Sequence, residues 1–163
     1  MQRFTELLVW QRSHALTLEM YRLTSRFPND ERFGMISQLR RAALSVPTNI
    51  AEGSKRMSNL EFARFLNIAE GSLAETEYLL MVCRDLGYVS REQCEDHLNE
   101  ITQVAKMLHG LRSKVEKTSQ KSRVESRQHL AGASGAPRLQ AETANRRTVS
   151  FFPFCLLTFD CQL

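Results

Sequence analysis

Residues 36–53 carry the apolar pattern that most restricts the fold of this chain. Apolar or small side chains recur there at alternating intervals of three and four residues, at Ile36, Leu39, Ala43, Val46, Ile50 and Gly53. This spacing places them on one face of an α-helix and does not fit the period of two expected for a strand. The segment predicts a long helix, over about residues 31–56, with one face against a core.

A proline interrupts this helix at position 47. Proline removes one backbone donor and disturbs the carbonyl group four residues earlier, here that of Ala43, at a cost of about 3 kcal/mol in a helix interior. We therefore expect a kink near Val46 and Pro47. Such a kink would point Arg40 and Arg41 in a different direction from Lys55 and Arg56, or it would simply wrap the helix around the core.

Three further helical patterns accompany this segment. The first, over about residues 7–25, has a stripe of Leu7, Trp10, His14, Leu18 and Tyr21. The third helix begins with the capping box Ser58–Glu61, ends before Gly87, and has a stripe of Phe62, Leu66, Ala69, Leu73, Thr76, Leu80 and Cys83. The fourth begins at a second box, Ser90 with Gln93, ends near Lys117, and has a stripe of Ile101, Val104, Leu108, Leu111 and Val115. No strand pattern stands out.

Four helices joined by short breaks predict an all-α fold, an up-down-up-down antiparallel four-helix bundle with its second helix kinked near Pro47. Small residues on the second and third helices predict close packing between them. Gly71 in particular indicates a tight crossing or a close contact with another subunit, because a glycine costs roughly 1 kcal/mol within a helix.

The character of the chain changes after residue 117. We assign residues 1–117 to the bundle and residues 118–163 to a low-order, disordered tail, since that segment is polar and has no sustained apolar period. Its last fifteen residues are strongly apolar but contain Pro153 and are too short to span a bilayer. They are a membrane-associating or partner-docking tail, or a non-native extension such as a shifted reading frame.

The charge is concentrated in the same tail. The chain has a formal net charge of +4, of which +1 belongs to residues 1–118 and +3 to residues 119–163. A basic surface on the bundle must therefore come from local clustering. Five cations of the second and third helices form the candidate cluster: Arg40, Arg41, Lys55, Arg56 and Arg64. They either bind phosphates or form ion pairs within a helix or between subunits. At least one of Arg40 and Arg41 should face solvent or pair with an acid such as Glu52, Glu75 or Glu77.

Enzyme and metal signatures are mostly absent. The chain lacks phosphate-binding glycine loops, zinc-protease and serine-hydrolase motifs, and the Glu-x-x-His pairs of di-iron bundles. One weak ribonuclease-like pattern, Arg91 with His97, competes with a solvated arginine and a surface histidine. His14 is interpreted as a core-edge histidine. We expect no enzyme activity, no cofactor and no metal.

The four cysteines, Cys83, Cys94, Cys155 and Cys161, form no metal-like spacing and are interpreted as buried or inert thiols in a reducing compartment. The N-terminus has no leader pattern and no segment is long enough to cross a membrane. These features predict a cytoplasmic protein without membrane contact.

Together these residues resemble a family of small bacterial four-helix bundle proteins, the 23S rRNA intervening-sequence proteins. The resemblance covers about residues 4–117 and rests on Leu8–Gln11, Phe27 with Pro28 and Glu31, Gln38–Gly53, Ser54–Arg56 and Ile68–Glu75. It implies a homo-oligomer, a five-fold ring, without established enzymatic activity. A related accessory protein of diversity-generating retroelements works with a reverse transcriptase and nucleic acid, so the resemblance makes such an enzyme a candidate partner.

Two functional hypotheses follow, with a third more remote one. The first is a non-enzymatic, homo-oligomeric nucleic-acid-binding protein, a pentamer by the family resemblance, that contacts phosphates through the five cations. The family association favours RNA over DNA as its ligand. The second is a protein-interaction adaptor or scaffold ring whose arginines form ion pairs between subunits. The third is a ribonuclease that uses Arg91 and His97.

Overall fold

The computed structural model describes residues 3–133, with side-chain surroundings given for residues 3–123. Within this range four α-helices follow one another: α1 (Leu8–Thr24), α2 (Met35–Gly53), α3 (Asn59–Asp85) and α4 (Arg91–Ala133). Two short 3-10 turns, η1 (Phe4–Glu6) and η2 (Asn29–Arg32), precede α1 and α2. The described residues contain no strand, and the all-α prediction is confirmed.

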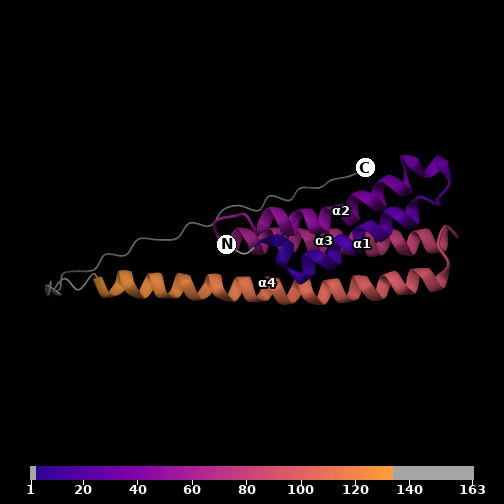
Figure 1. The fold of residues 1–163 in the computed structure, drawn as a ribbon. Coiled ribbons are helices and arrows are strands. Elements are labelled where there is room, and N and C mark those ends of the chain that lie inside the picture. The colour runs from indigo at the N-terminus through magenta and orange to yellow at the C-terminus, as the bar shows by residue number, and fades with distance from the viewer. Residues whose placement is uncertain (1–2, 134–163) are drawn as a thin grey trace, which may run out of the picture.

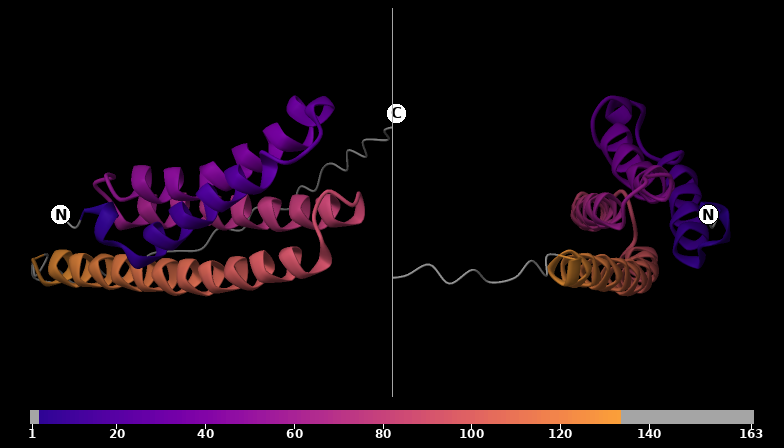
Figure 2. Two further views of the ribbon diagram at one scale, coloured as in Figure 1. Left: turned by 45° about the vertical axis from the view of Figure 1, so that its right-hand side comes forward. Right: turned by 90° about the vertical axis from the view of Figure 1, so that its left-hand side faces the viewer.

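The helices alternate in direction and pack as neighbours in chain order (Figure 1). Each of α1 and α3 contacts both α2 and α4, so the four helices close into a bundle. Seen from its end, in the right view of Figure 2, the bundle has α3 and α4 on one side and α1 and α2 on the other. The core joins the fully buried Met20, Leu39, Leu66 and Leu108, one from each helix.

The predicted stripe of α2 is confirmed, since its six members are all buried. The helix starts at Met35, four residues later than expected, because residues 29–32 form η2 instead. Glu31 supplies the helix cap: its Oε2 accepts a hydrogen bond from the Met35 N–H at 2.9 Å, and its Oε1 accepts one from the Tyr88 hydroxyl at 3.1 Å. The helix contains Pro47 and is bent, as predicted.

The two predicted capping boxes and the glycine stop are also confirmed. Ser58 Oγ accepts the Glu61 N–H at 3.2 Å, and Ser90 Oγ accepts the Gln93 N–H at 3.2 Å. After α3, Gly87 has a φ of 77°, and the Tyr88 N–H donates back to the Cys83 carbonyl at 2.9 Å. This left-handed residue with its backward bonds is a Schellman motif, which ends α3 sharply.

Two predictions about the helices are wrong. On α1 most of the predicted stripe does not face the core: Leu7 and Trp10 pack partly against it, but His14, Leu18 and Tyr21 are exposed. The positions of α1 that are buried are Val9, Ser13, Leu16, Thr17, Met20 and Thr24. On α4 the helix continues sixteen residues past the end expected near Lys117, to Ala133. Figure 1 shows that this last part of α4 extends beyond the other three helices.

Some predictions concern residues that the structure does not describe. They are those for the apolar C-terminal segment, Cys155 and Cys161.

Candidate nucleic-acid interface

Lys55 and Arg56 lie in the short loop where α2 turns into α3. The two helices approach closely at this end because α2 finishes in a glycine. A Cβ atom at Gly53 would lie 2.6 Å from Phe65 Cβ and 2.9 Å from Phe62 Cδ2, so no other residue fits without displacing α3. The loop therefore leaves a tightly packed helix end and exposes both cations to solvent.

Each of these two cations stands over an aromatic ring. Lys55 Nζ lies 5.9 Å from the centre of the Phe4 ring, and the Arg56 guanidinium lies 4.7 Å from the centre of the Phe65 ring. Arg56 also forms an ion pair with Glu52. Cation–π contacts at exposed sites contribute about 0.5–1 kcal/mol, enough to orient the charges without removing them from water.

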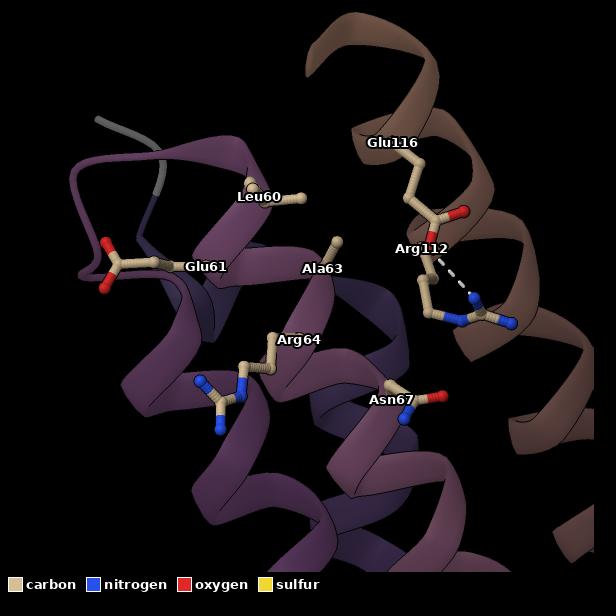
Figure 3. Close-up of a pocket in the computed structure, with 7 residues that line it drawn as sticks. All are labelled: Leu60, Glu61, Ala63, Arg64, Asn67, Arg112 and Glu116. Atoms are coloured by element: carbon tan, nitrogen blue, oxygen red, sulfur yellow. Dashed lines mark hydrogen bonds and ion pairs between the residues drawn. The ribbon is translucent and has the colours of Figure 1, made fainter. Parts of the chain in front are cut away.

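Arg64 lies beside the same loop, at a groove between the start of α3 and α4 (Figure 3). The groove has a volume of about 480 Å³ and is lined by Leu60, Glu61, Ala63, Arg64, Asn67, Arg112 and Glu116. Arg112 is neutralised within it: its Nε donates to Glu70 Oε2 at 3.0 Å and its Nη1 to Glu116 Oε1 at 2.9 Å. These bonds raise the pKa of Arg112 further above its usual value. Arg64, by contrast, has no ion pair with any side chain of residues 3–123.

Arg40 is engaged with α1 at the opposite end of the bundle. Its Nε donates to the buried Thr24 Oγ1 at 2.7 Å, and its guanidinium lies 4.8 Å from the centre of the Tyr21 ring. Its Nη2 approaches the Tyr21 carbonyl oxygen at 3.4 Å. Arg40 thus fastens the start of α2 to the last turn of α1.

Arg41 is the more exposed of the two arginines, with 70% of its side chain accessible. Its Nη2 lies 3.4 Å from Glu75 Oε1 on α3 and donates to Gln38 Oε1 at 2.8 Å. Arg41 is thus both exposed and paired with Glu75, as predicted for at least one of the two adjacent arginines.

Within one chain the five predicted cations do not form a single patch. Lys55, Arg56 and Arg64 gather at the α2–α3 loop, and we call this set the loop-end surface. Arg40 and Arg41 lie near the start of α2, separated from its end by roughly 18 Å of helix at 1.5 Å per residue. That these residues bind nucleic acid stays a prediction.

Comparisons with known proteins identify the family. The family model described as "23S rRNA-intervening sequence protein" matches residues 5–110. The chain belongs to this family. A crystal structure of a Bacteroides thetaiotaomicron protein, described as having unknown function and coming from the S23 ribosomal protein family, is similar with 29% identity and a TM-score of 0.59. The similarity covers 64% of this chain and 98% of the Bacteroides protein. No curated protein matches the chain.

All five predicted cations of this 23S rRNA-intervening sequence family member lie inside the matched residues, and the end of α4 lies outside them. The aromatic partners of the loop-end surface were not anticipated. Phe65 does not belong to the stripe predicted for the third helix, and no sequence spacing connects Phe4 with Lys55, fifty-one positions later. Only the close packing of η1 against the end of α2 brings that pair together.

Arg91 and His97, the ribonuclease-like pair of this family member, do not lie at a common site. Arg91 is the exposed first residue of α4, and six helical positions place His97 about 240° further around the helix. His97 faces α1, with its Nδ1 3.4 Å from Glu19 Oε2. It lines a cleft of about 170 Å³, whose lining does not include Arg91.

Cys83 and Cys94 are both buried and free. Burial raises the pKa of the Cys83 thiol to about 11, so it is neutral at physiological pH. The described residues contain no group of three His, Cys, Asp or Glu side chains suited to a metal ion. Among the same residues, no helix combines the length and apolar character that crossing a bilayer requires.

Proposed function

We propose that this protein is a non-enzymatic, homo-oligomeric nucleic-acid-binding protein that acts in the cytoplasm and contacts phosphates through its loop-end surface. The observation that carries this proposal is the gathering of three exposed cations, Lys55, Arg56 and Arg64, at one end of the bundle. Two of them are oriented by aromatic rings, and Arg64 has no ion pair with a carboxylate among residues 3–123. Such cations bind phosphate oxygens without regard to sequence.

RNA is the favoured ligand because the family description refers to an intervening sequence of 23S rRNA. The favoured assembly is a homopentamer, in which five loop-end surfaces would repeat around one axis and strengthen the local positive field. Arg41 contributes as a secondary contact, since its pair with Glu75 is exposed and weak. Arg40 is not part of the loop-end surface, because its guanidinium lies against α1 at the other end of the bundle.

The test is binding of the full-length protein to a structured RNA and to duplex DNA over a series of salt concentrations. We expect affinity to fall steeply with salt, and the logarithmic slope to decrease by about 1 for each phosphate contact removed. The test variant is Lys55→Ala/Arg56→Ala/Arg64→Ala. The control is Arg22→Ala/Arg26→Ala/Arg91→Ala, which removes three exposed cations from the opposite end.

Loss of binding in the first variant with binding retained in the control supports the loop-end surface. Absence of salt-sensitive binding by the wild-type protein, or equal loss in both variants, refutes it. Native mass spectrometry of the same samples reports whether the assembly is a pentamer.

The alternative is an adaptor or scaffold ring that docks a partner protein, such as a reverse transcriptase, without touching nucleic acid. Exposed apolar side chains at the same end favour it: Met57 is 99% exposed, and Leu8 and Leu60 are exposed as well. The variant Arg40→Ala/Arg41→Ala separates the two ideas. Loss of the oligomer supports ion pairs between subunits, whereas an intact oligomer that no longer binds nucleic acid supports the phosphate-binding role.

A further inference from the structure

Most of the stripe predicted for the first helix lies on the surface, with Trp10 packed partly against the core. Trp10 is half-buried, His14 is exposed, and Leu18 and Tyr21 are 41% and 40% exposed. These residues recur at intervals of four, four and three, so they share one outer face of the helix. We call this face the α1 track.

Aromatic rings at one end of the track are stacked on one another. Phe4 meets Trp10 edge to face, with ring centres 5.1 Å apart and an angle of 66°. Trp10 and His14 lie parallel, with centres 5.1 Å apart and an angle of 4°. The indole covers one face of the exposed imidazole, and the chain thus presents a preformed stack that ends in solvent.

Cations stand at both ends of this track. Lys55 lies over Phe4 at the first end and Arg40 lies over Tyr21 at the other. Between them the chain advances from Trp10 to Tyr21, roughly 17 Å of helix. The track therefore joins one cation of the loop-end surface to one of the two cations at the far end of α2.

Within α1 no carboxylate lies on this face, and the exposed Glu6 neighbours Phe4 in η1. Glu19 is the one acidic residue within α1, and it faces α4, where its Oε2 lies 3.4 Å from His97 Nδ1. On α2, the positions that share a face with Arg40 and Lys55 by helical spacing are Leu44, Thr48 and Ala51, all uncharged. A positive surface with exposed aromatic faces is complementary to a chain of phosphates that carries planar bases.

We propose that the α1 track binds single-stranded nucleic acid, with unpaired bases stacking on His14 and Tyr21 and phosphates bound by Lys55 and Arg40. This inference rests on the proposed function, which it narrows from nucleic acid in general to unpaired strands. A fully paired duplex offers phosphates to the loop-end surface but no free base faces to the track.

The experiment uses the full-length protein and three fluorescein-labelled probes: a 20-nucleotide uridine strand, a 20-nucleotide deoxythymidine strand and a 20-base-pair RNA duplex. Affinity is measured by fluorescence anisotropy. Binding at the track is reported separately by Trp10, the one tryptophan of the chain, whose emission should be quenched by a stacked base. The variants are His14→Ala and Tyr21→Leu, with Tyr78→Leu as a control because Tyr78 is a 66% exposed tyrosine on α3.

We expect His14→Ala and Tyr21→Leu each to weaken binding of the single strands about fivefold or more, since one stacked base contributes about 1–3 kcal/mol. Duplex binding should stay within about twofold, and Tyr78→Leu should change neither. Circular dichroism verifies that the variants are folded. Weaker binding of either single strand supports the track, and the ratio between uridine and deoxythymidine shows whether RNA is preferred.

Single strands that bind as well to His14→Ala and Tyr21→Leu as to the wild type, with no quenching of Trp10, would overturn the track. If the duplex still binds in a salt-sensitive way, the loop-end surface survives that result. If no probe binds at low salt, the proposed function and the track fail together.

Discussion

Pro47 leaves a carbonyl group in the middle of α2 without its helical donor, and a side chain of α1 supplies a replacement. The group is that of Ala43, four residues before the proline. The Thr17 hydroxyl donates to this oxygen at 2.9 Å and lies 2.8 Å from the Ser13 carbonyl oxygen, so it shares one proton between two acceptors. Both threonine and proline are buried. The bend in α2 is thus tied to α1 by a specific hydrogen bond.

Replacing Thr17 by valine should destabilise the protein by about 1–3 kcal/mol, because the Ala43 carbonyl would then be buried without a partner. Urea unfolding followed by circular dichroism measures the loss. Thr48→Val is the matched control, since the exposed Thr48 hydroxyl bonds only to its own helix, at Leu44, and should cost under about 0.5 kcal/mol.

Replacing Pro47 provides a second test of the hydrogen bond between the Thr17 hydroxyl and the Ala43 carbonyl. In a Pro47→Ala background the new amide can donate to Ala43, so the effect of Thr17→Val should shrink by about 1 kcal/mol. An equal loss in both backgrounds would contradict the proposed link between the two residues.

The paired arginines of α2 should differ in their effect on stability. Arg40→Ala should cost about 1–2 kcal/mol, since it removes a hydrogen bond to the buried Thr24 and a contact with the Tyr21 ring. Arg40→Lys should rescue little, because lysine lacks the planar fork. Arg41→Ala should cost less than about 0.5 kcal/mol, as expected for an exposed pair. Thermal unfolding of the three variants tests this ranking, and equal effects of Arg40→Ala and Arg41→Ala would contradict it.

At the scale of elements, the sequence located the helices well but assigned the wrong face to α1. The face that is buried contains Ser13, Thr17 and Thr24, which read as polar in a sequence. In the structure each of these hydroxyls donates to a backbone carbonyl of its own helix, for example Thr24 to Met20 at 2.7 Å. No buried side-chain polar atom among the described residues lacks a partner. Periodicity of hydrophobic residues cannot detect polar residues that satisfy themselves within a helix.

The close packing between α2 and α3 was predicted, but the glycine that permits it is Gly53 and not Gly71. Nothing lies within 4 Å of a Cβ placed at Gly71, so an intramolecular crossing there is wrong. Contact of Gly71 with another subunit stays a prediction. Gly53→Ala should cost about 1–3 kcal/mol through its collision with Phe65. Gly71→Ala should instead stabilise the fold by about 0.5–1 kcal/mol, because it improves helix propensity.

Urea midpoints of the two glycine variants provide the measurement, with Gly110→Ala as a reference at another open helical site. A destabilised Gly71→Ala protein would contradict the expectation for an isolated chain. A change in its oligomeric state at the same time would identify Gly71 as a subunit contact.

For the whole molecule, sequence reasoning selected the cations but could not say how they are grouped. The pairing of Arg41 with Glu75 could be anticipated from the opposite charges on adjacent helices. The contact of Arg40 with α1 could not be anticipated, because it depends on which face α1 turns toward α2.

The segment after Lys117 was expected to be of low order because it has no apolar stripe. The structure continues α4 to Ala133, which a solvated helix can do without a stripe.

The part of α4 beyond the bundle should therefore contribute little to the stability of the fold. The last members of its stripe that pack against the core are Leu111 and Val115, and Figure 1 shows no helix beside the segment that follows. A chain that stops after Lys117 should unfold cooperatively, with a midpoint within about 3 °C of the full-length protein. A chain that stops after Gln103 is the control: it lacks the fully buried Val104 and Leu108 and should lose the cooperative transition. Differential scanning calorimetry distinguishes these outcomes, and a large loss on removing residues 118–163 would show that this segment packs against the bundle or a second subunit.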